Sequence, residues 1–146
     1  MDQDENEVCF TGTFEHTLDP KGRVSLPAKI RRDLPQTVKT VLSLDKKSVY
    51  VFDPKAYKAW FDSFFPNGVN PRSTQDVKLQ QRLMAFSEDS DIDSAGRIGI
   101  SQKLRALVGL DKDVTILGCG DHLEIVDRER FAAVEQDLLA MDFMVD

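Results

Sequence analysis

The sequence predicts an α+β fold in which one short unit occurs twice and the two copies share a single core. Apolar residues that alternate with polar ones next to turns containing Gly or Pro predict strands. Segments that begin at a capping Asp or Ser and repeat apolar residues every three to four positions predict helices. The chain has 146 residues, of which 41% are apolar and 30% charged, a composition typical of one globular domain.

The two copies are related by a shift of 74 positions without a gap. This shift places Asp19–Arg23 on Asp93–Arg97, so the pattern Asp-x-x-Gly-Arg occurs in both copies. Apolar residues also fall on apolar residues: Leu18, Val24, Leu26 and Ile30 align with Ile92, Ile98, Ile100 and Leu104. A unit of roughly fifty residues buries too little surface to be stable alone, so we expect both copies to build one core.

The first copy predicts two strands, a short helix, a hairpin and a second helix. Apolar residues at even positions predict a strand over 8–18, and Asp19-Pro-Lys-Gly22 has the composition of a turn. A strand over 24–26 follows, and then a helix that Pro27 begins and Pro35 ends, running through Leu34. The segments 41–44 and 49–52 form a hairpin, and Asp53-Pro54 begins a helix that continues toward Phe65.

The second copy repeats this order after a linker. Residues 66–71 form a loop, and Ser73 begins a linker helix. Strands are expected around the turn 93–97, a helix over 102–108 that Gly109 ends, and strands over 114–117 and 123–126. Asp127 caps a final helix, and the apolar stripe expected on that helix consists of Phe131, Val134, Leu138 and Met141.

The charges are distributed unevenly along the chain. Residues 1–7 carry four acids and no base, residues 8–72 eleven bases and six acids, and residues 73–146 eight bases and fifteen acids. The net charge of −6 argues against a nucleic-acid partner, but a polyanion responds to the local potential of the basic half, because charges are screened beyond about 8 Å. The same split permits contacts between the basic half of one subunit and the acidic half of its neighbour.

The N-terminus and the cysteines bear on the compartment. The first seven residues are acidic where a secretion signal is basic, and no apolar run reaches the ~20 residues needed to span a bilayer. Two cysteines do not form a disulfide framework. We therefore expect a cytoplasmic protein without membrane association.

The sequence offers little to support catalysis or metal binding. Asp89-x-Asp91-x-Asp93 resembles the start of a calcium loop, but Ser94 and Ile100 occupy the positions that require Gly and an acid. Gly118-Cys-Gly120 lacks the remaining features of a phosphate loop. The two cysteines and two histidines have no recognisable zinc spacing. We expect no enzyme activity, no metal, no cofactor and no small-molecule ligand.

The repeated Asp-x-x-Gly-Arg turn has two interpretations from the residues alone. In the structural one, Asp19 and Asp93 fix the turns that Gly22 and Gly96 permit, and each pairs with its arginine. In the other, the turn projects an arginine toward a partner. The first copy favours recognition, because five bases fall within twelve residues: Lys21, Arg23, Lys29, Arg31 and Arg32.

Two segments carry a resemblance to a known family. The first is Phe10-x-Gly-x-Phe14 followed by Leu18-Asp-x-Lys-Gly-Arg-Val-Ser-Leu-Pro27 and Arg31; the second is Asp93-x-x-Gly-Arg-Ile98 with Leu104-Arg105, Gly109-Leu110 and Lys112-Asp-Val114. Over about residues 8–140 the chain resembles the MraZ family of bacterial transcriptional regulators. It departs from the pattern in the acidic extension before Val8, in Val126, and in Gly99-Ile-Ser101 where the first copy has Ser-Leu-Pro.

The resemblance implies a fold and a domain plan. It implies two AbrB-like swapped-hairpin units that form one pseudo-symmetric small barrel with peripheral helices. The expected units are a first repeat over 8–55, a helical linker over 56–81, a second repeat over 82–129 and a C-terminal helix over 130–146.

The resemblance also implies a function and a site. It implies a sequence-specific DNA-binding regulator, acting as a repressor of the bacterial cell-division and cell-wall gene cluster, associated with the nucleoid and assembled in ring-like homo-oligomers on direct-repeat boxes. The DNA-binding residues carried over are Lys21, Gly22, Arg23, Ser25 and Arg97. Lys29, Arg31 and Arg32 are expected to contact phosphates or form internal salt bridges. The alternative is a scaffold or regulator that binds protein partners through the basic N-terminal half.

Overall fold

A computed structural model describes residues 8–144, and the acidic extension 1–7 lies outside the described residues. Six strands form one sheet in the order β1-β7-β8-β4-β3-β5, and every neighbouring pair is antiparallel. The strands are β1 (Thr13–Thr17), β3 (Thr37–Leu42), β4 (Ser48–Phe52), β5 (Ser87–Asp91), β7 (Asp113–Gly118) and β8 (Leu123–Asp127). A separate two-stranded ribbon pairs β2 (Arg23–Ser25) with β6 (Arg97–Gly99).

The strand order confirms the duplicated swapped-hairpin fold. Exchanging the two copies, β1 for β5, β3 for β7 and β4 for β8, reproduces the same order read from the other edge. Each copy gives its first strand to the other, because β1 pairs with β7 and β5 pairs with β3. In the ribbon, Val24 lies opposite Ile98, its equivalent after the shift of 74 positions. The molecule is an α+β small barrel with a pseudo-twofold axis through the ribbon.

One core fills the space between the sheet and the ribbon. Val24, Ile98, Leu104 and Ile125 are at most 1% exposed and belong to a single apolar cluster drawn from both copies. Neither half can bury these side chains alone, since each packs against the other. The short helices α1 (Ala28–Arg31) and α4 (Gln102–Val108) contribute Ile30 and Leu104 to this cluster.

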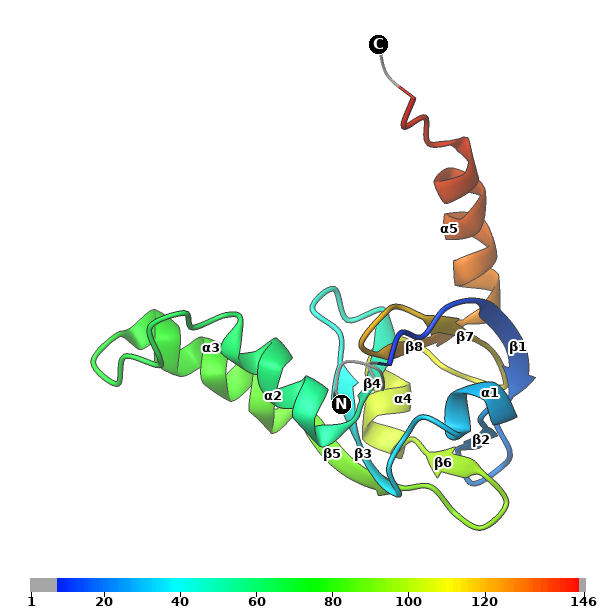
Figure 1. Cartoon of the computed structure of the whole chain (residues 1–146), viewed down its shortest axis with the longest axis horizontal. Coiled ribbons are helices and arrows are strands. Elements are labelled where there is room, and N and C mark those ends of the chain that lie inside the picture. Colours follow the sequence, from blue (N-terminus) through cyan, green and yellow to red (C-terminus); the bar gives the residue numbers. More distant parts are fainter. Residues whose placement is uncertain (1–7, 145–146) are drawn as a thin grey trace, which may run out of the picture.

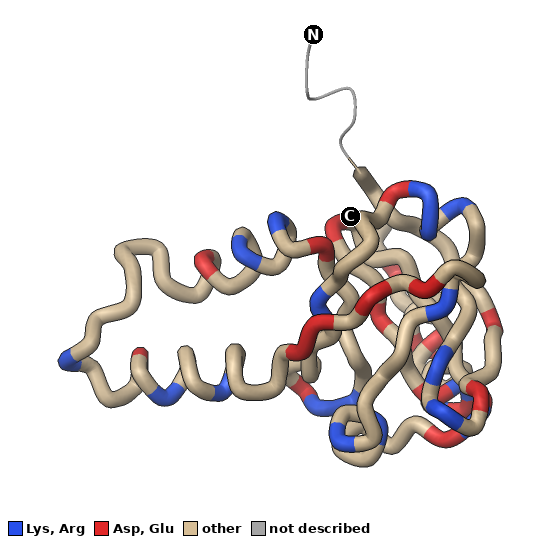
Figure 2. The backbone as a smooth tube through the Cα atoms, turned by 90° about the horizontal axis from the view of Figure 1, so that it is seen from below, with Lys and Arg blue, Asp and Glu red and all other residues tan. Residues whose placement is uncertain are grey.

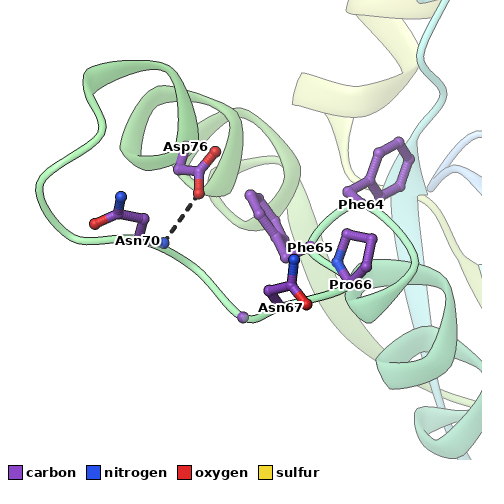
Figure 3. A pocket seen from close by; sticks show the side chains of 7 residues that line it. Phe64, Phe65, Pro66, Asn67, Asn70 and Asp76 are labelled. Carbon is purple, nitrogen blue, oxygen red and sulfur yellow. Dashed lines mark hydrogen bonds between the residues drawn. The ribbon is translucent and has the colours of Figure 1, made fainter.

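Three longer helices leave the barrel. The helices α2 (Pro54–Asp62) and α3 (Thr74–Ala85) form an arm on one side, and α5 (Arg128–Ala140) extends in another direction (Figure 1). The arm has an apolar cluster of its own, formed by Phe61, Phe65 and Leu83. At its tip, an open hollow lies beside the loop where Asp76 accepts a hydrogen bond from the Asn70 N–H (2.9 Å, Figure 3). In the part of the chain that is described, no helix is long and apolar enough to cross a bilayer.

The predicted helix caps are confirmed. Asp53, Ser73 and Asp127 each accept a hydrogen bond from the backbone N–H three residues on. Ser101 caps α4 in the same way, although the sequence did not predict that cap. Gly109 ends α4 with a left-handed φ of 72°. Three predicted elements are shorter than expected: the first strand begins at Thr13 because Gly12 (φ 95°) interrupts it, α1 ends at Arg31, and α2 ends at Asp62.

The repeat predicted a strand before the turn 93–97, although the composition of strand β5 alone does not predict one. Its residues, Ser-Glu-Asp-Ser-Asp, have low strand propensity, but the backbone ladder with β3 and side-chain contacts hold them. Lys39 Nζ lies 2.6 Å from Asp89 Oδ1, and Thr37 Oγ1 donates to Asp91 Oδ1 (2.7 Å). The acids of β5 are visible as a red run where the chain leaves the arm for the barrel (Figure 2).

The apolar stripe predicted on the last helix is largely exposed. Phe131 is buried against the barrel, but Val134, Leu138 and Met141 are 43%, 50% and 53% exposed. The helix projects beyond the barrel, so none of the elements described over residues 8–144 covers the outer part of the stripe (Figure 1). The unit boundaries expected from the sequence stay a proposal; α3 runs to Ala85 and α5 begins at Arg128.

Candidate nucleic-acid interface

The two Asp-x-x-Gly-Arg turns have the same backbone geometry. In the first turn the Asp19 N–H donates to the Arg23 carbonyl (2.8 Å) and the Gly22 N–H to the Asp19 carbonyl (2.9 Å); in the second turn both equivalent bonds measure 2.9 Å. Gly22 and Gly96 both have φ +79°, a conformation that glycine adopts without steric cost. The repeated motif is therefore one structural device used twice.

Each turn's aspartate holds the arginine that follows it. Asp19 Oδ1 accepts the backbone N–H groups of Lys21 and Arg23 (both 2.9 Å), and Oδ2 accepts Arg23 Nε (2.7 Å). Asp93 makes the same set with Ala95 and Arg97, with Arg97 Nε at 2.9 Å. The structural interpretation of the motif is thus realised in both copies.

Because each aspartate binds only the Nε of its arginine, the two Nη groups of each guanidinium remain available to a partner. Arg23 and Arg97 are about one-third exposed, and among the described residues their terminal nitrogens donate no hydrogen bond. A guanidinium fixed at Nε presents its two Nη groups in a known orientation. The structural and recognition interpretations are therefore compatible.

The ribbon brings the two turns together. Strand β2 pairs with β6 so that Arg23 lies opposite Gly99 and Ser25 opposite Arg97. Asp19 Oδ2 also lies 3.9 Å from Arg97 Nη1, so one carboxylate faces the arginines of both copies. The ribbon and its turns lie at the lower right of Figure 1, whereas the arm extends to the left and α5 upward.

Backbone donors keep both aspartates ionised. The hydrogen bond from the Arg23 N–H, with further bonds from the Arg23 side chain and the Lys21 N–H, lowers the pKa of the Asp19 carboxyl. The equivalent bonds from Arg97 and Ala95 lower the pKa of Asp93. The carboxylates are therefore anionic at neutral pH and hold the arginines as charged pairs.

Each turn is covered by an arginine from the other copy, a contact that the sequence did not predict. A Cβ added to Gly22 would lie 2.6 Å from the Arg105 guanidinium carbon, and one added to Gly96 would lie 2.6 Å from Arg31 Nη1. Arg105 Nε donates to the Ile100 carbonyl (2.9 Å). The shift of 74 positions already aligned Arg31 with Arg105, but their crossed placement depends on the swapped topology.

The remaining predicted residues lie around these turns. Lys21 and Ser25 are exposed on the first turn and strand β2. Lys29, Arg31 and Arg32 are exposed on α1 and at its C-terminal end, and Arg31 packs over Gly96, so α1 adds its bases beside the second turn. The equivalents of Lys21 and Ser25 in the second copy are Ala95 and Gly99.

The fold and these turns define a class: the protein is a duplicated swapped-hairpin protein with AbrB-like units, fused in one chain. The family model of the MraZ protein matches residues 9–81 and again residues 85–146, and the chain belongs to the MraZ family. Curated relatives named transcriptional regulator MraZ include that of Treponema denticola, 33% identical over 122 residues (84% of each chain).

Other relatives agree with this assignment. The transcriptional regulator MraZ of Marinomonas is 34% identical over 145 residues, covering 94% of this chain and 92% of the relative. That of Spiroplasma kunkelii is 34% identical over 121 residues, covering 82% of each. The protein is therefore a member of a family of transcriptional regulators, and no enzyme class is implied.

Proposed function

We propose that the two-turn surface binds double-stranded DNA in a sequence-specific manner. The surface consists of the turns 19–23 and 93–97, the ribbon and the exposed bases of α1. The observation that carries the proposal is the pair of arginines held by Asp19 and Asp93 on one ribbon, with Asp19 Oδ2 2.7 Å from Arg23 Nε and 3.9 Å from Arg97 Nη1. The protein would act in the cytoplasm, on the nucleoid, as a repressor of the division and cell-wall gene cluster.

Arg23 and Arg97 are the proposed base-reading side chains. The O6 and N7 atoms of guanine in the major groove accept two hydrogen bonds from an arginine, which is the commonest specific contact. An arginine whose Nε is already bound loses less side-chain entropy when it binds a base. Asp19 and Asp93 are then turn-fixing residues that position the readers, and Gly22 and Gly96 permit the turns.

The surrounding bases are proposed to contact phosphates. Lys21, Lys29 and Arg32 are exposed and flank the turns, and Ser25 offers a hydroxyl on the ribbon. Such contacts fix the position of a protein on DNA without specifying sequence. Arg31 is placed differently from its neighbours, since it packs over Gly96 and its Nη2 lies 3.4 Å from the Ser94 carbonyl.

The test is selection of bound duplexes from random DNA, followed by variants on the selected sequence. Arg23→Ala should weaken specific binding by about 1–3 kcal/mol, or roughly 5- to 150-fold in Kd, without unfolding the protein. The control is Arg72→Ala, an exposed base in the arm loop, which should leave the affinity unchanged. A protein that enriches no duplex, or a folded Arg23→Ala variant with full affinity, would refute the assignment; binding of a protein partner alone would favour the scaffold alternative.

Salt dependence separates the two kinds of contact. The logarithm of the binding constant should fall by about 0.9 per logarithmic unit of salt for each phosphate neutralised. Lys21→Ala should reduce this slope by about 1 and weaken binding to all duplexes equally. Arg23→Ala should instead relax the preference at particular base pairs.

We also propose that the chain assembles in a ring-like homo-oligomer and binds direct-repeat boxes. The outer part of α5 leaves Leu138 and Leu139 50% and 76% exposed, and Phe143 beyond it is 75% exposed. Contiguous apolar exposure of this kind marks an interface. Because both copies lie in one chain, no symmetric dimer is needed to complete the barrel, and neighbouring subunits can associate head to tail.

The assembly predicts spaced binding sites. Subunits in a ring face the same way around it, so evenly spaced boxes should bind far more tightly than one box, by about 10²–10⁴-fold where the spacing fits. Light scattering and binding to one, two and four boxes measure this. A monomer at micromolar concentration that binds one box as tightly as four would refute the assembly. That result would not contradict DNA binding by the two-turn surface.

A further inference from the structure

We propose a transition-metal site, of the zinc class, at the tip of the β7–β8 hairpin, formed by Cys119, His122 and Glu124. One ligand atom from each of these residues, a sulfur, an imidazole nitrogen and a carboxylate oxygen, lies within 4.8 Å of the other two. The site is separate from the DNA-reading surface, since it lies in the hairpin that joins β7 to β8, and it does not depend on the proposed function.

The spacing of the ligand atoms suits a tetrahedral ion. Zinc bonds of about 2.0–2.1 Å to nitrogen and oxygen place two such ligands about 3.4 Å apart at the tetrahedral angle. The observed distance from His122 Nε2 to Glu124 Oε2 is 3.4 Å, long for a hydrogen bond. A small adjustment of the Cys119 side chain completes a three-residue set, and solvent supplies the fourth ligand.

Asp121 orients the histidine for this role. Its Oδ1 lies 2.8 Å from His122 Nδ1. A carboxylate that accepts the Nδ1 proton leaves Nε2 unprotonated toward the metal and raises the basicity of the ring, which is the usual arrangement around zinc-binding histidines. The ring is also fixed by packing, with centroids 4.7 Å and 5.0 Å from those of Tyr50 and Phe52.

The cluster combines negative potential with access. The carboxylates of Asp121 and Glu124 place negative charge beside the thiol and the imidazole, which favours a cation. Cys119 and Glu124 line an open hollow of about 300 Å³ at the foot of α5, which gives an ion a path to the site. Arg130 also lines the hollow, but its Nη1 donates to the carbonyls of Lys47 and Val108.

The donor set favours zinc over calcium or magnesium. A thiolate and an imidazole are ligands that zinc prefers, whereas hard cations require oxygen ligands throughout. The sequence alone predicts no metal site here, because Cys-x-x-His-x-Glu lacks the second ligand pair of the usual zinc patterns. The pairing of β7 with β8 places the three side chains close together, and the spacing of the residues alone does not reveal this.

The test is equilibrium dialysis of the full chain against zinc ions after treatment with a chelator. We expect one zinc per chain, and a loss of more than about 100-fold in affinity for Cys119→Ser, because losing a ligand should exceed the 10- to 100-fold cost of losing an outer partner. Asp121→Asn should cost about 10- to 100-fold. The matched controls are Cys9→Ser and His16→Asn, which remove the chain's other thiol and other imidazole and should leave the affinity unchanged.

Cobalt substitution tests the site in the wild-type chain, so the result does not depend on whether a variant folds. The wild-type chain loaded with Co²⁺ should show a thiolate-to-cobalt charge-transfer band and the intense visible bands of four-coordinate cobalt, and Cys9→Ser should retain both. If the three side chains form only a histidine–carboxylate ion pair, zinc will not bind and no thiolate band will appear. That result, or zinc binding that survives in Cys119→Ser, would overturn the proposal.

Discussion

Replacing Gly22 by alanine tests the close approach between the first turn and the second copy. At φ +79° a residue with a Cβ costs about 1–2 kcal/mol. The new Cβ would lie 2.6 Å from Arg105 Cζ and Nε, so the guanidinium must move and give up its hydrogen bond to the Ile100 carbonyl. A bond to a charged group contributes about 1.5–3 kcal/mol, and the lower end applies because Arg105 is only half-buried. The expected total is about 2–4 kcal/mol.

The assay is urea unfolding at one fixed protein concentration, since assembly would shift apparent stability. The matched control is Gly68→Ala, because Gly68 has φ +80° and no atom lies within 4 Å of its added Cβ. That variant should cost only the backbone strain of about 1–2 kcal/mol. In an Arg105→Ala background, the cost of Gly22→Ala should fall to the same value, so the double-mutant cycle isolates the contact.

Two results would refute the reasoning about Arg105. Equal costs for Gly22→Ala and Gly68→Ala would mean that the arginine does not constrain the turn. A cost for Gly22→Ala that does not change when Arg105 is removed would mean the same. Either outcome would leave the backbone conformation of Gly22 as the only reason for glycine there.

Two further predictions concern the turns and the core. Carboxyl NMR titration should give Asp19 and Asp93 pKa values below the ordinary aspartate value. Because folding lowers these pKa values, the stabilisation from both groups is fully present at a pH above the ordinary aspartate pKa. It is lost as the pH falls through the lowered pKa values of the folded protein. Ordinary midpoints would contradict the hydrogen bonds assigned to the turns. In urea unfolding, Ile98→Ala, at a site that is 0% exposed, should lower the free energy of unfolding by about 2–5 kcal/mol. Leu139→Ala, at a site that is 76% exposed, should change it by no more than about 0.5 kcal/mol. Similar changes for the two variants would contradict the position of the ribbon over the core.

The internal repeat predicted much of the fold because its spacing is kept in the structure. Strand β2 at 23–25 becomes β6 at 97–99, and the first residue of α2, Pro54, becomes Arg128, the first residue of α5. Helix caps were predictable because they depend on one side chain and a backbone N–H three residues away. These are local signals that one sequence contains in full.

Strand β5 could not be predicted from its own composition. Its composition predicts a loop, but the same shift of 74 positions carries β1 (Thr13–Thr17) onto Ser87–Asp91, so the repeat identified it where propensity did not. The exposed stripe of α5 shows a second limit of local signals. Periodicity predicts an apolar face but not what covers it, and Leu138 remains 50% exposed on this chain.

At the candidate site, contacts within a turn were predictable and contacts between the copies were not. The pairing of Asp19 with Arg23 spans four residues and follows from turn geometry. The position of Arg105 against Gly22 and the approach of Asp19 to Arg97 require β2 to pair with β6. The hairpin cluster of Cys119 and Glu124 likewise depends on strand pairing, which the residue spacing does not encode.

Fusion of the two copies gives a nearly symmetric backbone with unequal side chains. The turns match bond for bond, but the first presents Lys21 and Ser25 where the second presents Ala95 and Gly99. Asp19 reaches the arginine of the other copy, and within 4.0 Å of Arg23 the described residues provide no matching contact from Asp93. A dimer of identical chains is restricted to equal halves, whereas these two halves have diverged. The proposed DNA-binding surface is therefore directional, which suits direct repeats better than a palindrome and agrees with the head-to-tail assembly proposed from α5.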